Sequence, residues 1–590
     1  MTSAEYNSAI SFENGSTVAR TDFASPKTAA DWAALGQRHL AANAVAQAVA
    51  SFEHAAALEP QVAMHWARLG KVQAAMRQHE AAEAAFARAC TLEPLNPTLH
   101  VLLAGGLREQ NKPEEAIDAC VRALKAAPDN IPAVVTRALM LPPVYAGLDD
   151  LEKWRERYID GLARLNARKA LWLRQPRGVL GVEATNFYLA YQGKADLAVQ
   201  SGYSDFLASL LSAAVPDLRA PLERRSDRSR RIRVGFLSSN LKASTIGGYF
   251  GSWISELPRD RFEVHGVLAA GIPDLRTEAF ARASDNFVSV DGAADEIARR
   301  VKSLALDILV FLDAGMMPWG NLLANLRLAP VQCAAWGHPV TTGSTFVDYY
   351  LSCADMEPED ASAHYRERLV LLPGLGTRYT PPPQVESAER AEFGLPAHKH
   401  VYLCPQSLFK IHPDTDTLLL DLLARDEDAV LVFFAATTRG QREAFVRRLE
   451  AGMKVRGLPP RQQIKLLPPM SHGDFRRVMA VADVMLDTLH WSGGSTSLDA
   501  LATGLPVVTL PGRFMRGRQS AAMLRIIGVE ELIASDPDQY VALALRVAND
   551  GEYRASLTSR IRDGLPRLFD RPEPVAALAA ALEKMVSPQP

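Results

Sequence analysis

A repeat of 34 residues near the start of the chain restricts its possible folds more than any other feature. Residues of the same type recur at this spacing in seven pairs: Trp32 and Trp66, Leu35 and Leu69, Gly36 and Gly70, Ala48 and Ala82, Phe52 and Phe86, Ala55 and Ala89, and Pro60 and Pro94. A third copy keeps four of these positions: Leu103, Ala116, Ala123 and Pro128. A fixed period of this length is typical of stacked supersecondary units.

Each repeat is predicted to be a pair of antiparallel helices. Small alanine residues let two helices approach closely, and the proline ends the unit because it cannot continue a helix. One unit cannot bury its apolar face alone, so successive units stack into a superhelix. The spacing and residue types match the tetratricopeptide pattern. We expect a loose N-terminus over 1–27 and a tetratricopeptide array over 28–148, which either binds a protein on its concave face or is a purely structural cap.

A second helical segment follows the repeats. Residues 149–230 are predicted to form a helical connector that ends in an arginine-rich stretch bounded by prolines. No aromatic residues interleave with these arginines, which favours a solvated linker over a nucleic-acid site. The net charge of −2 also gives no support for a nucleic-acid or acidic membrane partner.

The second half of the chain alternates strands with helices. Apolar runs such as "IRVGFLSSN", "LDILVFLDAG", "HVYLCPQ" and "AVLVFFAA" each precede a helical pattern. This alternation predicts parallel sheets flanked by helices. A polar stretch over 379–397 begins with three prolines and is interpreted as an interdomain linker. We therefore expect one Rossmann-like lobe over 231–378 and another, with the terminal helices, over 398–590.

One loop of the second lobe has the composition of an anion site. In "HWSGGSTSLDALATG", Gly493 and Gly494 precede Ser495 and Thr496 at the predicted start of a helix. The glycines would let the backbone approach an anion, and the free N–H groups and the helix dipole would favour negative charge. Asp499 follows about one turn later, where it could reach a ribose hydroxyl. A simple N-capped helix is the alternative interpretation.

Three other residues at predicted strand ends are candidates for the site. Lys410, in "PQSLFKIHP", could meet a diphosphate as a point charge or could be an ordinary surface lysine. His338, in "WGHPVTTG", could act as a general base, bind a sugar or be structural. Asp313 ends the apolar run "ILVFLD" and suits either a general base or a helix N-cap. The five cysteines show no metal-like spacing, so no metal site is expected.

These segments together resemble the O-GlcNAc transferase and SPINDLY-like glycosyltransferases, the inverting GT-B group classed as family 41. The matching segments include "SLFKIHPDT", "ADVMLDTL" and "GGSTSLDALATGLPVVTLPG", and with the repeats they extend over nearly the whole chain. The resemblance implies an α plus α/β protein, in which a tetratricopeptide superhelix precedes a GT-B fold of two Rossmann-like lobes. It also implies that the donor nucleotide lies mostly on the second lobe.

The resemblance assigns roles to the candidate residues. It implies that Lys410 contacts the donor diphosphate and that Asp499 binds the ribose. It places Gly494, Ser495 and Thr496 at the pyrophosphate, where the family has a His-Thr-Thr set. No metal or other cofactor is implied, because the lysine and the helix N-terminus neutralise the charge.

The chain departs from the family pattern near the reaction centre. Ser244 and Thr245 stand where the GlcNAc transferases carry a His-Pro pair. Gln406 is shifted by one position from the family glutamine, and Gly494 replaces the histidine. These changes leave two donors open: UDP-GlcNAc, or the CMP-linked nonulosonic acid of a similar bacterial branch that has short repeat arrays and modifies flagellin.

The resulting hypothesis is a cytoplasmic protein O-glycosyltransferase. The repeats would hold a protein acceptor, flagellin being one candidate, and its Ser or Thr hydroxyl would attack the donor sugar while Asp313 or His338 takes the proton. Three alternatives remain: transfer to Asn, lipid or glycan; a repeat scaffold with an inactive transferase domain; and a sugar-nucleotide epimerase, which leaves the repeats unexplained. The cytoplasmic expectation rests on the lack of a signal-peptide pattern and of an apolar run as long as a membrane span.

Overall fold

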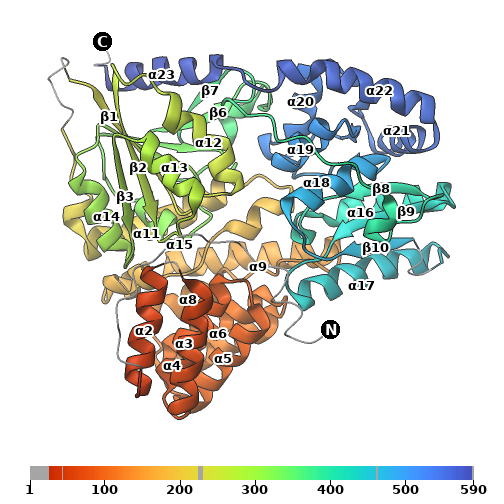
Figure 1. The fold of residues 1–590 in the computed structure, drawn as a ribbon. Helices are drawn as coiled ribbons and strands as arrows, with labels where there is room; N and C mark the ends of the chain where they lie inside the picture. Colours follow the sequence, from red (N-terminus) through yellow and green to blue (C-terminus); the bar gives the residue numbers. More distant parts are fainter. Residues whose placement is uncertain (1–25, 43, 224–229, 460–462, 588–590) are drawn as a thin grey trace.

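The computed structural model describes residues 26–42, 44–223, 230–459 and 463–587. Most of the predicted loose N-terminus lies outside these residues, as do Arg224, Arg225 and Arg228 of the basic stretch. Figure 1 shows three parts: a block of N-terminal helices, coloured red to orange, and two α/β lobes that lie side by side above it.

Antiparallel helix pairs form the N-terminal block, and the predicted tetratricopeptide class is confirmed. The helices are α2 (Ala29–Ala41), α3 (Val45–Leu58), α4 (Ala63–Ala75), α5 (His79–Leu92), α6 (Pro97–Glu109), α7 (Pro113–Ala126), α8 (Ile131–Ala138) and α9 (Leu148–Ala167). The repeated glycine has a packing reason, because a β-carbon at Gly70 would lie 2.7 Å from the ring of Phe86. In the third copy Ala104 replaces the glycine and Cys120 replaces the phenylalanine, and both are fully buried. The smaller side chain of Cys120 accompanies the added β-carbon of Ala104.

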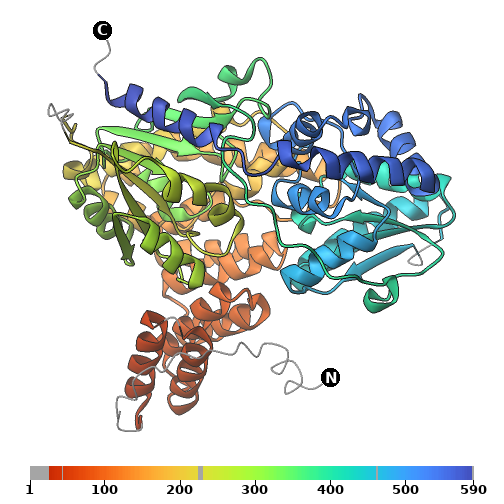
Figure 2. The ribbon, with the colours of Figure 1, turned by 45° about the horizontal axis from the view of Figure 1, so that its top comes forward.

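The connector joins the repeats to the first lobe through a shared core. After α9 it contains α10 (Lys169–Trp172), η2 (Pro176–Gly181), η3 (Phe187–Gln192), α11 (Leu197–Ala214) and η4 (Pro216–Leu218). Phe206 and Leu207 of α11 belong to the same buried cluster as Leu237 and Phe311 of the first sheet. Helix α9 lies between the repeats and the two lobes in both ribbon views (Figures 1 and 2).

The first lobe is built on a seven-stranded parallel sheet with the order β3-β2-β1-β4-β5-β6-β7. Its strands are β1 (Ile232–Ser238), β2 (Phe262–Ala269), β3 (Asn286–Val290), β4 (Ile308–Phe311), β5 (Val331–Ala335), β6 (Tyr349–Cys353) and β7 (Arg368–Leu372). Its helices are α12 (Thr245–Glu256), α13 (Leu275–Ala283), α14 (Ala294–Ser303) and α15 (Pro318–Leu323). Strand β6 was not among the strands predicted from the apolar runs.

The second lobe is built on a five-stranded parallel sheet with the order β10-β9-β8-β11-β12. Its strands are β8 (His400–Cys404), β9 (Ala429–Phe434), β10 (Ile464–Leu467), β11 (Val484–Leu486) and β12 (Val507–Val508). Its helices are α16 (Pro413–Arg425), α17 (Arg439–Val455), α18 (His472–Val481), α19 (Ser495–Thr503), α20 (Gln519–Ile527), α21 (Pro537–Asn549) and α22 (Gly551–Gly564). The two sheets confirm the expected pair of Rossmann-like lobes.

The last helix, α23 (Glu573–Val586), returns to the first lobe (Figure 2). Glu583 forms an ion pair with Arg261 at 3.0 Å, and Met585 contacts Cys333 of β5. The sequence interpretation had grouped the terminal helices with the second lobe, whereas this helix packs on the first. Its buried apolar face, which includes Leu578 and Leu582, supplies the reason for that placement.

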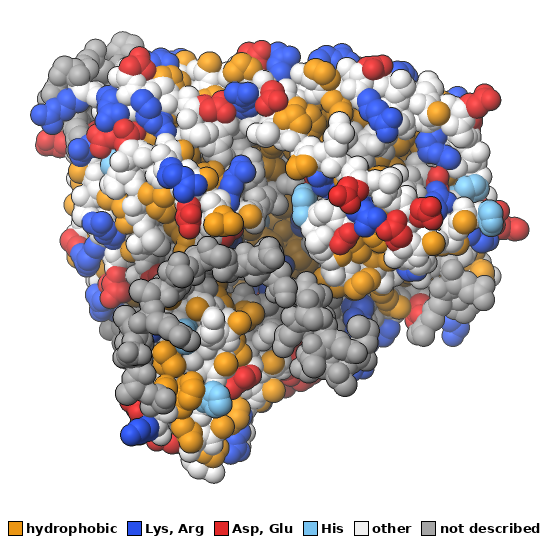
Figure 3. All heavy atoms as spheres, viewed as in Figure 1, with side chains coloured by type: hydrophobic (Ala, Val, Ile, Leu, Met, Phe, Trp, Pro, Cys, Tyr) orange, Lys and Arg blue, Asp and Glu red, His pale blue; other side chains and the backbone are white. Residues whose placement is uncertain are grey.

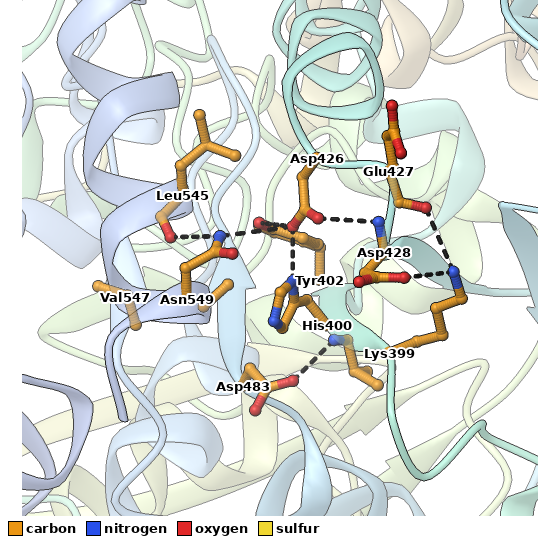
Figure 4. A network of polar contacts seen from close by, with 12 residues as sticks. Lys399, His400, Tyr402, Asp426, Glu427, Asp428, Asp483, Leu545, Val547 and Asn549 are labelled. Atoms are coloured by element: carbon orange, nitrogen blue, oxygen red, sulfur yellow. Dashed lines mark hydrogen bonds and ion pairs between the residues drawn. The ribbon is translucent and has the colours of Figure 1, made fainter. Parts of the chain in front are cut away.

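Polar contacts close the amino-terminal edge of the second sheet (Figure 4). The carboxylate of Asp426 lies 2.8 Å from Nδ1 of His400 and accepts a hydrogen bond from the hydroxyl of Tyr402 at 2.7 Å. Asp483 accepts a hydrogen bond from the backbone N–H of Val401 at 2.7 Å. These contacts lie at the amino ends of the strands. The loops at the opposite, carboxyl ends are where parallel sheets of this kind bind ligands.

The face of the molecule drawn in Figure 3 carries charged side chains of both signs, which are interspersed over both lobes. Within the described ranges, no helix is both long enough and apolar enough to cross a bilayer. All five cysteines are buried and free.

Candidate functional site

Two loops of the second lobe meet at the switch point of its sheet, between β8 and β11. The loop after β8 carries Gln406 and Lys410, and the loop after β11 leads into α19. The side-chain amide of Gln406 donates a hydrogen bond to the hydroxyl of Thr496 at 2.9 Å. The structure therefore brings two of the predicted donor-binding residues into contact, at the place where parallel sheets of this kind bind ligands.

A buried carboxylate fixes the loop before α19. Asp487, which follows β11, accepts hydrogen bonds from the backbone N–H of Gly493 at 2.7 Å and from the hydroxyls of Ser492 and Thr509 at 2.6 and 2.8 Å. Burial raises the pKa of Asp487, and these hydrogen bonds act against that rise. A side chain at Gly493 would collide with the hydroxyl of Ser497, so tight packing alone requires glycine here.

The first lobe contributes a residue to the start of α19. The backbone N–H of Ser495 donates a hydrogen bond at 2.9 Å to the hydroxyl of Tyr249, which belongs to α12 and lies 246 residues away in sequence. A β-carbon at Gly494 would overlap that hydroxyl oxygen. Glycine at this position therefore makes room for Tyr249. The sequence analysis named Ser244 and Thr245 of this segment only as a departure from the family pattern. It did not single out Tyr249, since no local pattern indicates a contact between lobes.

Replacement of Tyr249 by phenylalanine is expected to weaken nucleotide binding about 10- to 100-fold. The hydroxyl accepts from Ser495 and keeps its own hydrogen to donate to an anion at the start of α19, and a hydrogen bond to a charged group contributes ~1.5–3 kcal/mol. Calorimetry with UDP and CMP measures the change. Tyr379→Phe is a matched control. The centre of the Tyr379 ring lies 5.6 Å from that of Tyr249, but among the described residues Tyr379 forms no hydrogen bond to α19. Equal affinity of Tyr249→Phe and the unaltered protein would exclude contact between this hydroxyl and the nucleotide.

Lys410 lies at the end of η7 (Leu408–Lys410) and is partly exposed. Its ammonium group lies 5.6 Å from the centre of the Trp491 ring, and it forms no ion pair within the part of the chain that the structure describes. Burial lowers the pKa of Lys410 to about 8. A desolvated cation without a carboxylate partner at a strand end is suited to receive an anionic ligand.

His338 lies among aromatic rings where the two lobes and the connector meet. Its ring stacks on Phe187 at 5.7 Å and lies 6.4 Å from Trp491, which in turn contacts Tyr191 at 4.3 Å. Burial, with a smaller contribution from Arg516, lowers the pKa of His338 to about 3. The ring is therefore neutral near pH 7, and its buried Nε2 has no hydrogen-bond partner among the described residues. A neutral ring of this kind suits hydrogen bonding to a sugar better than strong general-base catalysis.

Asp313 is buried just beyond β4 and is already hydrogen-bonded. It accepts from the hydroxyl of Ser238 at 2.7 Å and from the amide of Asn240 at 2.9 Å. Burial raises the pKa of Asp313, while these two donors act in the opposite direction. The carboxylate thereby ties the loop after β1 to β4. The general-base roles of Asp313 and His338 both stay predictions.

Asp499 lies on α19 and faces α18. Its carboxylate is 3.5 Å from Nε2 of His472 and 3.7 Å from Nε of Arg476. The contact with Asp499 raises the pKa of His472. The carboxylate therefore has protein partners in this structure, and the ribose contact stays a prediction.

A pocket of about 390 Å³ opens at the carboxyl ends of β8, β9 and β10. Gln406 and His472 lie on its polar side, Phe434 and Phe475 give it aromatic walls, and Arg77 reaches it from the repeats. Gln406 also contacts Thr496, so this residue links the pocket wall to the start of α19. Flat aromatic walls of this kind suit a nucleoside.

A group that could hold a metal lies beside this site. Ligand atoms of His412, Asp414 and His490 lie within 4.8 Å of one another. The carboxylate of Asp414 is 2.8 Å from Nε2 of His490, and Nδ1 of His412 accepts from the backbone N–H of Asp414 at 3.1 Å. These hydrogen bonds engage Nδ1 of His412 and Nε2 of His490, whereas the buried Nε2 of His412 has no hydrogen-bond partner among the described residues. The expectation of a metal-independent site stays a prediction.

The sequence profile of glycosyl transferase family 41 matches residues 217–376 and 376–568, more than half of the chain. The chain belongs to this family. Among curated family 41 relatives, SEC of Arabidopsis thaliana is 25% identical over 343 residues, which cover 56% of this chain and 34% of SEC. SPINDLY of Solanum lycopersicum is 28% identical over 278 residues, which cover 45% of this chain and 28% of SPINDLY. Both carry the description of a probable UDP-N-acetylglucosamine–peptide N-acetylglucosaminyltransferase.

The family 41 chain spans about a third of the length of the curated relatives it matches. It is also similar to a solved O-GlcNAc transferase of Thermobaculum terrenum, with a TM-score of 0.70 and 23% identity. That similarity covers 95% of this chain and 97% of the solved one. The arrangement of repeats followed by two lobes is therefore a shared fold.

Proposed function

We propose that this family 41 chain is an inverting protein O-glycosyltransferase, which moves a sugar from a nucleotide sugar to a Ser or Thr hydroxyl of a protein. The observation that carries the proposal is the convergence at the β8/β11 switch point. Lys410 lies beside Trp491 of the loop that leads into α19. Gln406 both contacts Thr496 of α19 and lines a nucleoside-sized pocket. The names of the relatives, which describe transfer to peptides, point to the same reaction class.

The chemistry required of the residues is mainly positioning and stabilisation of charge. The acceptor oxygen attacks the anomeric carbon as the bond from that carbon to the donor phosphate breaks, and the acceptor proton passes to Asp313 or His338. Negative charge that builds on the leaving phosphate is met by Lys410 and by the positive end of the α19 dipole, and the hydroxyl of Tyr249, which accepts from the N–H of Ser495, donates to it. Enclosure between two lobes lowers the entropy cost of bringing the three groups together. No metal or other cofactor is proposed, because these groups supply the positive charge.

The repeats are proposed to hold the protein acceptor, with flagellin as the candidate. Their helix ends reach the second lobe: the backbone N–H of Arg439 donates to Glu80 at 2.9 Å, and Gln441 donates to the carbonyl of Glu109 at 3.0 Å. Arg77, beside these contacts, lines the nucleoside pocket. An acceptor on the repeats would therefore lie close to the donor.

The donor is proposed to be UDP-GlcNAc or a CMP-linked nonulosonic acid. Calorimetry with UDP, CMP and GDP tests the nucleotide first, and binding of UDP or CMP is expected. Incubation of the matching donor with flagellin, followed by mass spectrometry, is then expected to place the sugar on a Ser or Thr oxygen. A sugar on Asn would change the acceptor class. Absence of binding to all three nucleotides would refute the proposal and favour a repeat scaffold with an inactive transferase domain.

A further inference from the structure

A second pocket, of about 500 Å³, lies on the helical part of the chain, away from the donor residues. It is lined by the end of α7, by α8, by α9 and by α10. Leu165 and Trp172 are among its apolar residues. Its charged residues are four arginines: Arg137, Arg157, Arg164 and Arg168. The lining contains no aspartate or glutamate among the described residues.

The positive charge of this pocket, named here the arginine pocket, is little compensated. Arg137 and Arg168 form no ion pair within the described ranges. Arg164 faces Asp160 at 3.6 Å, but both side chains are about three-quarters exposed, and such pairs contribute little. Arg157 is used to cap α8, donating to the backbone carbonyls of Arg137, Ala138 and Met140. Nearby Arg137 and Arg164 lower the pKa of Arg157 further, after burial, which is the sign of mutual repulsion.

The arginines form a row rather than a point. Arg157, Arg164 and Arg168 are spaced by seven and four residues, which places them on one face of α9 and its extension. At 1.5 Å per residue this row is about 16 Å long. Gly161 lies within the row, where a side chain would collide with the carbonyl oxygen of Ala138, so α8 is held close against the same face.

We propose that the arginine pocket binds an acidic, extended segment of a partner protein that also inserts an apolar side chain. Arg157 is engaged with backbone carbonyls. The guanidinium groups left for a ligand are therefore those of Arg137, Arg164 and Arg168. They come from two helices and offer more than one point of contact to a chain that carries several carboxylates. Guanidinium groups favour carboxylates through paired N–H donors. Leu124 and Val134 are half-buried and offer apolar surface to the inserted side chain, whereas Leu165 and Trp172 are buried. This inference does not depend on the donor chemistry.

Fluorescence anisotropy of a labelled octapeptide of glutamates and two leucines tests the pocket on the full-length protein. The unaltered protein is expected to bind it saturably at low salt and less tightly as salt rises. The double variant Arg164→Glu/Arg168→Glu is expected to lose at least about tenfold in affinity, because both attraction and geometry are removed. Both side chains are exposed, so folding is expected to persist. Unchanged binding of UDP or CMP, or an unchanged unfolding midpoint where neither nucleotide binds, verifies this.

A charge-matched control separates the pocket from general electrostatics. Arg442→Glu/Arg447→Glu, on α17 of the second lobe, also reverses two exposed arginines and is expected to leave the peptide affinity unchanged. An equal loss in this control would overturn the proposal, as would the absence of saturable binding. Displacement of the peptide by inorganic pyrophosphate at the same concentration as by unlabelled peptide would identify a simple anion site and would also overturn it.

Discussion

Replacement of Lys410 by alanine is expected to lower the rate of sugar transfer about 100- to 1,000-fold, the range found when one preorganised donor to a developing negative charge is removed. Lys410 has no protein counter-ion among the described residues, so its charge is available to the leaving phosphate. Binding of the protein acceptor is expected to stay unchanged, because the acceptor is proposed to bind the repeats and Lys410 lies in the second lobe. Measurement of kcat and KM with the donor identified by calorimetry tests both statements.

The pH dependence of nucleotide binding gives a second readout for Lys410. Its pKa of about 8 in the ligand-free protein means that the charge is present below pH 8 and is lost as the pH rises through that value. A bound phosphate favours the charged form and raises this pKa, so binding above pH 8 takes up a proton. Affinity is therefore expected to fall between about pH 8 and pH 10 in the unaltered protein and to be flat there in Lys410→Ala.

Lys399→Ala is the control for this experiment. Lys399 is a lysine of the same lobe, paired with Asp428 at 2.6 Å at the opposite edge of the sheet (Figure 4). It is expected to leave transfer and the pH profile unchanged. Full transfer activity in Lys410→Ala would remove the lysine from the proposed mechanism, and a pH profile identical to that of the unaltered protein would assign the titration to another group.

The elements of this fold were predictable because their causes are local. The 34-residue period reflects a glycine that faces a phenylalanine within one helix pair, as at Gly70 and Phe86. Strands such as β1 and β8 are continuous apolar runs because both faces of a parallel sheet are covered. Strand β6 was missed because "YYLSC" mixes polar and aromatic residues and follows a loop rich in turn residues. The position of α23 on the first lobe was also missed, since an apolar helix face does not specify which surface it covers.

The site was predictable only in part for a related reason. The loops at strand ends were found from sequence, and the contact between Gln406 and Thr496 follows from the order of strands in the sheet. The hydroxyl of Tyr249 at the start of α19 and the partners of Asp499 on α18 depend on how lobes and helices pack. Contacts between residues that are far apart in the sequence produce no periodic pattern from which they could be predicted.

One contact between segments far apart in the sequence is expected to have a large effect on the free energy of unfolding. Asp196, which precedes α11, is 4% exposed and lies between two guanidinium groups. Arg516 of the second lobe donates to it at 2.9 Å, and Arg155 of α9 donates at 3.2 Å. Burial raises the pKa of Asp196, and both arginines act against that rise. This carboxylate therefore joins the helical connector to the second lobe.

Replacement of Asp196 by asparagine is expected to reduce the free energy of unfolding by about 3–5 kcal/mol, because it leaves two buried guanidinium groups without their countercharge. Their other hydrogen bonds, to the carbonyls of Ala190, Lys194 and Ala195, satisfy N–H groups but supply no negative charge. The shift in the urea midpoint, followed by the combined fluorescence of the eight tryptophans, measures the loss.

The control for Asp196 lies on the same helix. Asp205 of α11 pairs with Arg366 at 2.7 Å, but its side chain is 54% exposed. Asp205→Asn is therefore expected to cost no more than about 1 kcal/mol. Equal midpoints for the two variants would show that Asp196 is no more important than a surface pair. If the expected difference is found, the connector and the second lobe unfold as one cooperative unit, which Asp196 and the carbonyls of Ala190 and Lys194 join through Arg516.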